Sequence, residues 1–332
     1  MKKILVTGGC GFIGSCFVKE QINQQGNFVV NLDNLTYAGS LANVESVANS
    51  ANYVFVQDSI NNQALVQNLL QQYQIDWLVN FAAESHVDNA INGPEIFINT
   101  NVCGTYSLLQ ASVQYYQKNN KTDFRFLHVS TDEVFGSLSL TDKPFTKHNR
   151  YQPNSPYSAS KAASDHLVRA WHETFKLPTI ITNCSNNFGP FQHQEKLIPT
   201  IIRSCLQNKD IPIYGNGSNI RDWIFVADHC HGINLALTKG QIGETYLFGG
   251  NCELTNLDIA KQICLILDKL KPKANNISYQ HQIKFVQDRA GHDFRYAIDN
   301  SCSFNELGFS PSKSFNHRLT ETITHYIQVY GN

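Results

Sequence analysis

The chain has 332 residues, of which 42% are hydrophobic and 16% charged, and its formal net charge is −1. This composition is that of a folded globular protein and excludes an intrinsically disordered chain. A net charge so close to zero excludes a global attraction to nucleic acid or to an anionic membrane, so an anionic ligand must be held by local groups.

Compartment and metal content are predicted from the N-terminus, the cysteines and one short cluster. The N-terminus leads directly into a strand-like segment, and no apolar run is long enough to span a bilayer. The nine cysteines are an odd number without the spacing of a disulfide framework. The cluster DHCHG at 228–232 lacks a second ligand pair at zinc spacing. We therefore expect a reduced cytoplasmic protein that has no metal site and binds neither membranes nor nucleic acid.

Strand-like and helix-like segments alternate through the first half of the chain. The strand-like segments are continuously aliphatic or β-branched, which is typical of a parallel sheet covered by helices on both faces. Crossovers in such sheets are right-handed, so a Rossmann-type, doubly wound α/β fold is expected. Strands are predicted at 3–8, 28–33, 53–57, 77–82, 124–130 and 178–183, and helices at 12–25, 62–73, 95–117 and 158–176.

The alternation ends near residue 184, where segments rich in Gly, Pro and Asn begin. Since no stretch has the composition of a disordered linker, we expect a smaller α/β region interleaved with the first. The predicted cofactor-binding domain covers 1–183, with return segments at about 222–250 and 310–330. The predicted substrate-binding region covers 184–221 and 251–309.

A glycine-rich turn follows the first predicted strand and opens a helix. Gly8, Gly11 and Gly14 in TGGCGFIG permit a tight turn and the close approach of backbone N–H groups to a pyrophosphate. Asp33 ends the second strand about 20 residues after Gly14, where an acid binds the adenosine ribose. No Arg follows Asp33 to receive a 2′-phosphate, so the pattern favours NAD over NADP.

The segments after strands three and four add further cofactor candidates. Asp58 is expected either to contact the adenine amino group or to cap the next helix. The sequence FAAES at 81–85 places small residues where a strand end passes the cofactor. Thr100 and Asn101 open another segment that faces it.

A tyrosine and a lysine stand four residues apart in YSASK. Tyr157 and Lys161 therefore lie on one face of a helix. The ammonium group, with the positive nicotinamide, is expected to lower the pKa of the phenol so that it accepts a proton near neutral pH. Ser130 and Thr131, at the end of the fifth strand, are expected to hydrogen-bond the phenol.

Two adjacent acids, Asp132 and Glu133, follow that strand in STDEVFG. A solvated loop, a helix cap and an acid/base pair are the three interpretations of such a pair. Neighbouring residues on a regular strand face opposite ways, so both acids reach one ligand only if they lie just past the strand end.

Together these motifs resemble the extended short-chain dehydrogenase/reductase superfamily, and within it the nucleotide-sugar dehydratases, most closely the dTDP-glucose 4,6-dehydratases. The resemblance covers nearly the whole chain. It is carried by LTYAG, AAESHVD, STDEVFG, SPYSASKA, TNCSNNFGP, EKLIP, YGNG, IRDW and GHDFRYAID, in this order.

The resemblance implies a mechanism with Thr131, Asp132, Glu133, Tyr157 and Lys161 as catalytic residues. Tyr157 takes the proton of the sugar 4-hydroxyl while hydride passes to NAD. Glu133 removes the C5 proton, and Asp132 protonates the departing 6-hydroxyl. Hydride then returns to C6, which gives a 4-keto-6-deoxy sugar.

The resemblance also implies the binding residues and a homodimer formed through helices 95–117 and 158–176. For the cofactor NAD they are Gly8, Gly11, Phe12, Ile13, Gly14, Asp33, Asn34, Leu35, Thr36, Asp58, Ser59, Phe81, Ala82, Ala83, Ser85, Thr100, Ser130, Tyr157, Lys161 and Asn187. For the nucleotide-sugar substrate they are Ser85, Thr131, Asn186, Lys196, Leu197, Pro212, Ile213, Tyr214, Arg221, Asn256, Arg289 and His292.

Three positions depart from the family pattern. Phe135 stands where Tyr is common, Ala290 replaces a usual Pro, and Asn80 stands where His is frequent. None of these changes removes a catalytic group.

For the same dehydratase activity, the alternative substrate is UDP-glucose. The alternative activities are those of a nucleotide-sugar 4-epimerase and of a UDP-glucuronate decarboxylase. Neither epimerase nor decarboxylase needs the acid pair of STDEVFG. A non-catalytic NAD-binding regulator would not need the intact catalytic set.

Overall fold

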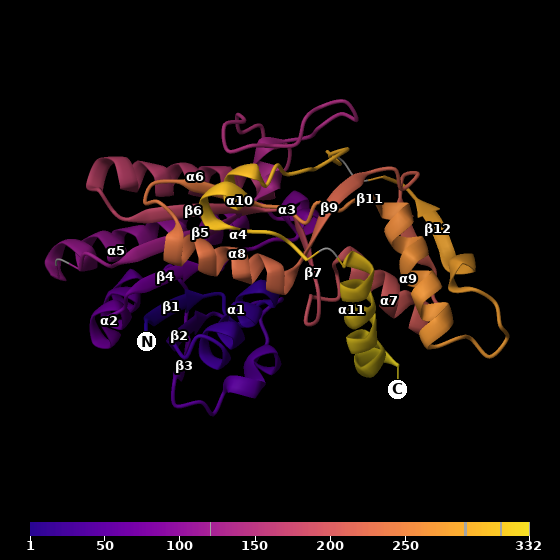
Figure 1. The fold of residues 1–332 in the computed structure, drawn as a ribbon, viewed down its shortest axis with the longest axis horizontal. Helices are drawn as coiled ribbons and strands as arrows, with labels where there is room; N and C mark the ends of the chain where they lie inside the picture. Colours follow the sequence, from indigo (N-terminus) through magenta and orange to yellow (C-terminus); the bar gives the residue numbers. More distant parts are fainter. Residues whose placement is uncertain (120, 289–290, 313, 332) are drawn as a thin grey trace.

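The structure is a computed structural model that describes residues 1–119, 121–288, 291–312 and 314–331. Its centre is a seven-stranded sheet in the order β10-β6-β5-β4-β1-β2-β3, shown in Figure 1. Every neighbouring pair in this sheet is parallel, so the predicted doubly wound Rossmann-type fold is confirmed. The strands are β1 (Lys3–Thr7), β2 (Phe28–Asp33), β3 (Tyr53–Gln57), β4 (Trp77–Asn80), β5 (Arg125–Thr131), β6 (Thr179–Cys184) and β10 (Thr245–Phe248).

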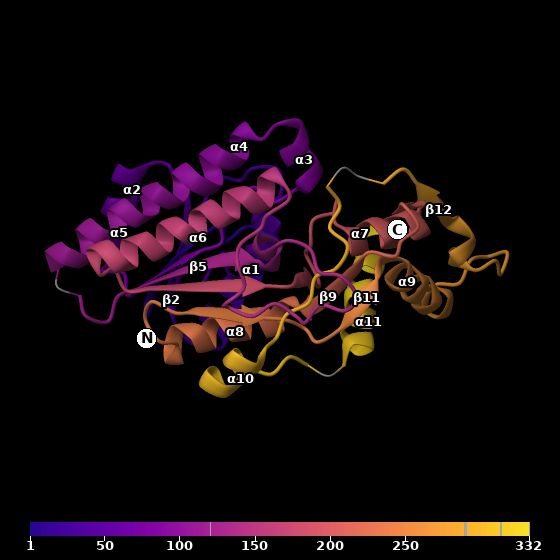
Figure 2. The ribbon, with the colours of Figure 1, turned by 90° about the horizontal axis from the view of Figure 1, so that it is seen from above.

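Helices cover both faces of this sheet, as Figure 2 shows. On one face, α2 (Gln63–Tyr73), α5 (Thr105–Asn119) and α6 (Pro156–Phe175) share an apolar core with the strands. On the other, α1 (Phe12–Asn23) and α8 (Val226–Lys239) do so, and α10 (Ser301–Leu307) packs beside them. Residues of β4 and β6 are buried throughout, as expected for central strands of a parallel sheet covered on both faces.

The predicted helix over 95–117 is divided in the structure. It consists of α4 (Glu95–Phe97), a π-helical segment η2 (Ile98–Gly104) and α5, preceded by the short α3 (Val87–Asn92). A π-helical turn changes the direction in which side chains leave the helix, and hydrophobic periodicity alone does not reveal it. Three short 3₁₀ segments complete this list: η1 (Leu41–Val47), η3 (Asp132–Phe135) and η4 (Tyr279–Gln282).

The second half of the chain builds a smaller region at the other end of the molecule from α5 (Figure 1). It contains a three-stranded sheet, β11-β9-β7, and a two-stranded parallel sheet, β12-β8. Its elements are β7 (Asn186–Phe188), β8 (Ile211–Tyr214), β9 (Ile220–Phe225), β11 (Glu253–Thr255), β12 (Ile283–Val286), α7 (Leu197–Leu206), α9 (Asn256–Leu270) and α11 (Phe315–Tyr330).

The position of α11 corrects one predicted boundary. The return segment at about 310–330 was assigned to the cofactor-binding domain, but α11 packs against α7 and α9 of the smaller region. Leu319, Ile323 and Tyr326 form its apolar stripe and are buried in the core of the smaller region.

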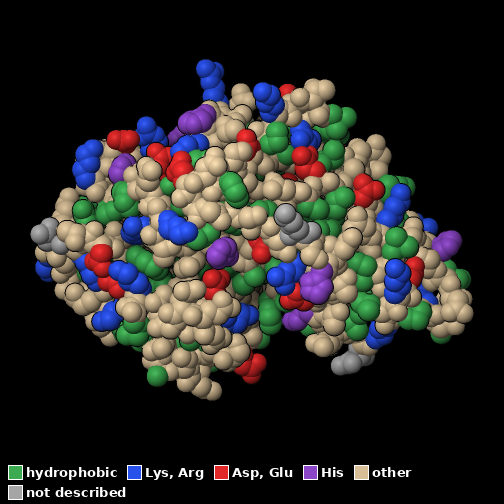
Figure 3. Space-filling model, viewed as in Figure 1, with side chains coloured by type: hydrophobic (Ala, Val, Ile, Leu, Met, Phe, Trp, Pro, Cys, Tyr) green, Lys and Arg blue, Asp and Glu red, His purple; other side chains and the backbone are tan. Residues whose placement is uncertain are grey.

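The surface carries both signs of charge interspersed, as Figure 3 shows for one face. This agrees with a formal net charge of −1 and with the absence of a strong global field. Among the described helices, none has the length and apolarity required to cross a bilayer.

Candidate active site

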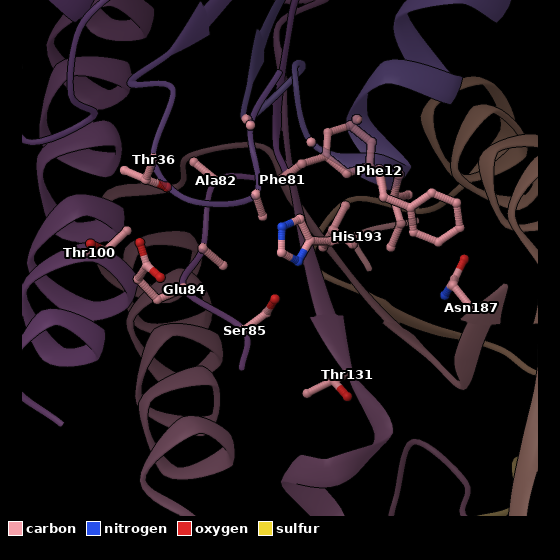
Figure 4. Close-up of a pocket in the computed structure, with 18 of the residues that line it drawn as sticks. Phe12, Thr36, Phe81, Ala82, Glu84, Ser85, Thr100, Thr131, Asn187 and His193 are labelled. Atoms are coloured by element: carbon pink, nitrogen blue, oxygen red, sulfur yellow. The ribbon is translucent and has the colours of Figure 1, made fainter. Parts of the chain in front are cut away.

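A cavity of about 320 Å³ opens at the carboxyl ends of the strands in the large sheet, within the size range of ligand pockets. Its lining combines the glycine turn, the ends of β2, β4, β5 and β6, and the start of α6. Figure 4 shows Thr36, Glu84 and Thr100 on one side of it, with Phe12 and Asn187 on the opposite side. Parallel strands present their carboxyl ends at one edge, and ligands bind in the crevice there.

The glycine turn has the geometry of a phosphate cradle. Gly8 has a φ of +71°, and a Cβ on it would lie 2.7 Å from the backbone nitrogen of Ala82. A Cβ on Gly14 would lie 2.3 Å from the carbonyl oxygen of Gly8, so the helix packs tightly against the turn. Gly11 is the N-cap residue of α1, and no side-chain capping bond occupies the N–H groups at the start of this helix. The residues of this turn therefore fit a dinucleotide.

Two carboxylates follow the strands beside this turn. Asp33 is buried at the end of β2 and accepts the backbone N–H groups of Cys10 and Leu35, each at 2.8 Å. Asp58 lines the cavity but does not cap α2. The cap is Asn62, whose side chain accepts from the backbone nitrogen of Leu65 at 3.2 Å.

Asp132 and Glu133 lie in the 3₁₀ turn η3, which begins where β5 ends. Thr131, the last residue of β5, starts the turn by accepting the backbone N–H of Glu133 at 3.3 Å. Because η3 is not part of the strand, the side chains of Asp132 and Glu133 need not point to opposite faces of the sheet. Both residues line the cavity.

The environment of Asp132 favours its protonated form. Burial raises the pKa of this carboxyl well above its ordinary value, and the nearby carboxylates of Glu133 and Asp222 raise it further. Its Oδ2 is buried and has no hydrogen-bond partner among the described residues. A buried carboxylic acid beside a second carboxylate can donate a proton while its neighbour accepts one.

Helix α6 carries both Tyr157 and Lys161 into the cavity. The helix starts in a capping box, in which the side chains of Ser155 and Ser158 each bond the other's backbone, with Pro156 in the first turn. Tyr157 packs edge-on against Phe97 at 6.4 Å between ring centroids. The capping box thus fixes the first turn of the helix, where the phenol is located.

The lowering of the Tyr157 pKa by Lys161 together with the nicotinamide stays a prediction. Burial raises this pKa well above 10.0, and the charge of Glu133 adds to the rise. Burial also lowers the pKa of the Lys161 ammonium to about 8. A positive charge on a bound ligand would lower the pKa of the phenol, as expected for the nicotinamide.

Ser130 does not hold the phenol as expected. Its hydroxyl donates to the Oδ2 of Asp165 at 2.8 Å, behind the cavity. Successive residues of β5 face opposite sides, so Ser130 and Thr131 do not serve the same group.

Most of the predicted site residues line this one cavity. They are Gly8, Gly11, Phe12, Ile13, Gly14, Asp33, Asn34, Thr36, Asp58, Ser59, Phe81, Ala82, Ala83, Ser85, Thr100, Ser130, Thr131, Asp132, Glu133, Tyr157, Lys161, Asn186, Asn187 and Lys196. The predicted residues outside its lining are Leu35, Leu197, Pro212, Ile213, Tyr214, Arg221, Asn256 and His292. Arg289 and Ala290 fall outside the described residues.

Arg221 lies near the cavity although it does not line it. Its guanidinium stacks over Tyr296 at 4.4 Å and donates to the carbonyl oxygens of Ile220 and Asp293 at 2.8 and 2.9 Å. Its charge lowers the pKa of Asp132, against the larger effect of burial. Ile213 is buried in the core of the smaller region, where an apolar residue stabilises packing.

Several lining residues were missed because they lie in loops without a chemical pattern of their own. Tyr37 packs edge-on against His193 at 5.5 Å, and the latter lies 3.5 Å from Glu195. Glu84 is buried, and burial raises its pKa. The signal in the sequence that could have identified Glu84 was its position in the segment AAES at 82–85.

The departures from the family pattern have structural partners. Phe135 packs against Phe145 and Tyr151 at 5.2 and 5.1 Å, so an apolar ring is accommodated there. Asn80 accepts the hydroxyl hydrogen of Thr7 at 2.6 Å and contacts His128 at 3.1 Å.

The chain is similar to enzymes that act on sugar nucleotides. The family model described as GDP-mannose 4,6 dehydratase matches residues 5–322. A dTDP-glucose 4,6-dehydratase from Haemophilus influenzae is 49% identical over 332 residues, covering 98% of each chain. One from Xanthomonas campestris is 51% identical, covering 97% of this chain and 92% of the relative.

Solved structures with similar folds include dehydratases and epimerases. A dTDP-glucose 4,6-dehydratase from Streptomyces venezuelae, solved with NAD and TYD bound, has a TM-score of 0.90 and 41% identity, covering 99% of this chain and 98% of that one. A UDP-glucuronic acid 4-epimerase from Bacillus cereus, solved with NAD and UDP-glucuronic acid, has a TM-score of 0.86 and 26% identity, covering 99% and 100%.

Proposed function

Since this chain belongs to the dTDP-glucose 4,6-dehydratase family, we propose that Asp132 and Glu133 are the acid and base with which it removes water from dTDP-glucose. The product is dTDP-4-keto-6-deoxyglucose, a precursor of deoxysugar nucleotides. Bound NAD supplies the acceptor for the C4 hydride, a positive charge beside the phenol, and the same hydride for C6 at the end of turnover.

Different side chains of the cavity carry out the successive proton transfers. Tyr157 removes the proton of the 4-hydroxyl, and the Lys161 ammonium stabilises the phenolate. The ketone formed at C4 acidifies C5, whose proton passes to Glu133. Asp132 gives its proton to the departing 6-hydroxyl, so that water leaves, and a proton finally returns to C5.

The observation that carries this proposal is the acid pair in η3, with Asp132 buried and Glu133 partly buried, within the cavity that the Tyr157–Lys161 pair also lines. An epimerase moves hydride at one carbon and eliminates nothing, so it has no use for the additional acid and base. Identity is 49–51% to curated dTDP-glucose dehydratases, against 26% to the epimerase from Bacillus cereus.

Incubation of the purified chain with dTDP-glucose, without added reductant, tests the function. We expect a 4-keto-6-deoxy product, followed by its absorbance after treatment with base, and no net change in reduced nicotinamide. A parallel incubation with UDP-glucose measures the nucleotide preference, and we expect the thymidine nucleotide to be preferred. Absence of product from both substrates contradicts the function.

The remaining predicted residues supply the proposed substrate contacts. Ser85, Thr131 and Asn186 face the sugar. The other substrate residues named from the sequence, apart from the core residue Ile213, hold the nucleotide and its diphosphate. The Lys196 ammonium already reaches the carbonyl oxygen of Ser85, at 2.9 Å, which supports a position at the mouth of the sugar site.

The homodimer also remains a proposal, with a second copy packed on α5 and α6. Both helices lie side by side on one face (Figure 2). Tyr106 in α5 is 43% exposed and packs edge-on against Trp171 of α6 at 5.8 Å. Phe175, at the end of α6, is 40% exposed. Such aromatic exposure supports a contact surface.

Sedimentation measures this assembly. We expect a dimer for the unmodified chain and a shift towards monomer for Tyr106→Glu, because a charge would be buried in the contact. The matched control is Phe304→Glu, an exposed aromatic on α10. A monomeric unmodified chain contradicts the proposal.

A further inference from the structure

A buried group of polar side chains lies behind Lys161, on the side away from the cavity. The Nζ of Lys161 donates to the carbonyl oxygen of Val129 at 2.8 Å and lies 3.3 Å from the Nε2 of His128. The same Nε2 lies 3.5 Å from the Oδ1 of Asp165. Both His128 and Asp165 are at least 99% buried. The imidazole therefore stands between the ammonium of Lys161 and the buried carboxylate of Asp165.

The tautomer of His128 follows from its other ring nitrogen. Thr7 donates its hydroxyl hydrogen to the Oδ1 of Asn80 at 2.6 Å, which directs the amide Nδ2 of Asn80 to the Nδ1 of His128 at 3.1 Å. An amide nitrogen only donates, so Nδ1 accepts and the ring proton is on Nε2. The Nζ of Lys161, 3.3 Å from this Nε2–H, is therefore a second donor in close contact with it and not its hydrogen-bond partner. Burial and the charge of Lys161 lower the pKa of His128 well below 6.5, so the ring is neutral.

The two oxygens of Asp165 have different surroundings. Ser130, Tyr151 and Asn183 all direct donors to Oδ2, at 2.8, 2.9 and 3.3 Å. Oδ1 has no hydrogen-bond partner within the described part of the chain and faces the Nε2–H of His128. Burial raises the pKa of Asp165 from 3.8 to about 6, while the charge of Lys161 and the three donors on Oδ2 oppose this rise, so the group is a carboxylate at neutral pH. Its second oxygen directs that charge towards the ring and the ammonium behind it.

We infer that Asp165 and His128 are positioning residues for the known reaction: the carboxylate keeps Lys161 charged, and the imidazole keeps the ammonium from pairing directly with it. Held in this way, the ammonium stays directed towards Tyr157 and the cofactor. This inference rests on the proposed function, in which Tyr157 and Lys161 perform the first proton transfer.

The expected pH effects follow from the groups that face Lys161. These are Tyr157 and Asp165 on its own helix, His128 on β5 and Cys184 on β6. Burial lowers the pKa of Lys161 to about 8, while the charge of Asp165 opposes this. Loss of the carboxylate therefore lowers this pKa further, whereas loss of the ring lets the ions approach and raises it.

The test measures the rate of the first half-reaction, followed by the absorbance of reduced nicotinamide after mixing with dTDP-glucose, across the neutral and alkaline range. For Asp165→Asn we expect the alkaline limb to move by about one unit or more to lower pH. For His128→Ala we expect it to move to higher pH, with a rate at least about tenfold lower at neutral pH because the ammonium turns away from Tyr157.

The control is Asp268→Asn, which removes a carboxylate bonded to Ser278 and Tyr279 in the smaller region and should leave the profile unchanged. Alkaline limbs of the pH–rate profiles that shift in opposite directions in Asp165→Asn and His128→Ala support the inference. Unshifted profiles for the folded variants overturn it, and if Asp165→Asn does not fold, the direction for His128→Ala decides alone. Inactivity of the unmodified chain would instead contradict the proposed function.

Discussion

At the scale of single residues, Asp132 and Glu133 are adjacent in sequence but differ in environment. Asp132 is 2% exposed, and burial raises the pKa of its carboxyl. Glu133 is only partly buried and lies close enough to raise the pKa of Asp132 and of Tyr157. Two like charges at this spacing favour one shared proton, which burial places on Asp132.

Replacement of the base should separate oxidation from elimination. In Glu133→Gln we expect NAD binding to persist and product formation to fall by about 10²–10⁴, the usual contribution of a general base. Reduced nicotinamide should accumulate on addition of dTDP-glucose, because C4 is oxidised and C5 keeps its proton. Normal turnover by this variant excludes the role given to Glu133.

Replacement of the acid should change stability as well as rate. A carboxyl whose pKa is raised in the fold contributes stability below its ordinary value of 3.8, and this contribution is lost as pH rises through the folded pKa. Asp132→Asn cannot ionise, so its melting temperature should exceed that of the unmodified chain at alkaline pH and approach it in acid. Its turnover should fall by about 10²-fold or more. A lower melting temperature at alkaline pH contradicts the assigned protonation.

At the scale of elements, Gly14 connects the glycine turn to the packing of α1. Gly14→Ala places a methyl group 2.3 Å from the carbonyl oxygen of Gly8, so the helix must shift. We expect a loss of about 1–3 kcal/mol in the free energy of unfolding, together with weaker binding of NAD. Titration with NAD and thermal unfolding measure the two effects.

The matched control for this helix is Gly26→Ala, in the turn after α1. A Cβ there meets no atom within 4 Å, although φ is +61°. Backbone strain alone should cost about 1–2 kcal/mol and leave NAD binding unchanged. Equal losses of NAD affinity in both variants contradict the packing argument.

The strands and long helices could be predicted from the sequence because each buries a continuous or periodic apolar face. Strands β2 and β3 have the predicted bounds, and the ends of the others differ by one or two residues. The site residues of the glycine turn, η3 and α6 were also predictable, since each needs its residue type at a fixed spacing. The loop residues Tyr37 and His193 were not, because tertiary contacts alone bring them to the cavity.

Two structural features could not be predicted from the hydrophobic periodicity of the sequence. The π-helical segment η2 lies within one continuous helical stretch between α4 and α5, and hydrophobic periodicity does not separate a π-helical turn from an α-helical one. The position of α11 was misassigned because an amphipathic helix shows that it packs, but not against which partner.

At the scale of the whole molecule, stability should fall in acid because the fold buries neutral histidines. His229 in α8 contacts the Oδ1 of Asn187 in β7 through Nδ1 at 3.0 Å, and burial lowers its pKa from 6.5 to about 3. A base with a lowered pKa contributes full stability above 6.5, and this is lost as pH falls from there towards 3. The total is on the order of several kcal/mol.

Urea unfolding between pH 7 and pH 4 measures this loss. We expect a smaller fall for His229→Asn, which cannot titrate, although its stability at pH 7 is lower. His172, half-buried with Nδ1 2.9 Å from the carbonyl oxygen of Leu177, supplies the control His172→Asn. Parallel pH dependences for the two variants contradict the role of His229.

The strand order of the large sheet also has a consequence for synthesis on the ribosome. Its outermost strand, β10, pairs with β6 through residues 245–248 and 181–184, so the sheet edge stays open while the intervening chain is made. Helix α8, which packs on the same face of the large sheet as α1, is also made in this interval. Before β10 is made, β6 pairs only with β5, and the open outer edge of such a strand is a template for association with other chains. Nascent chains stalled before Thr245 should therefore depend on chaperones, and release from that dependence should coincide with the emergence of β10.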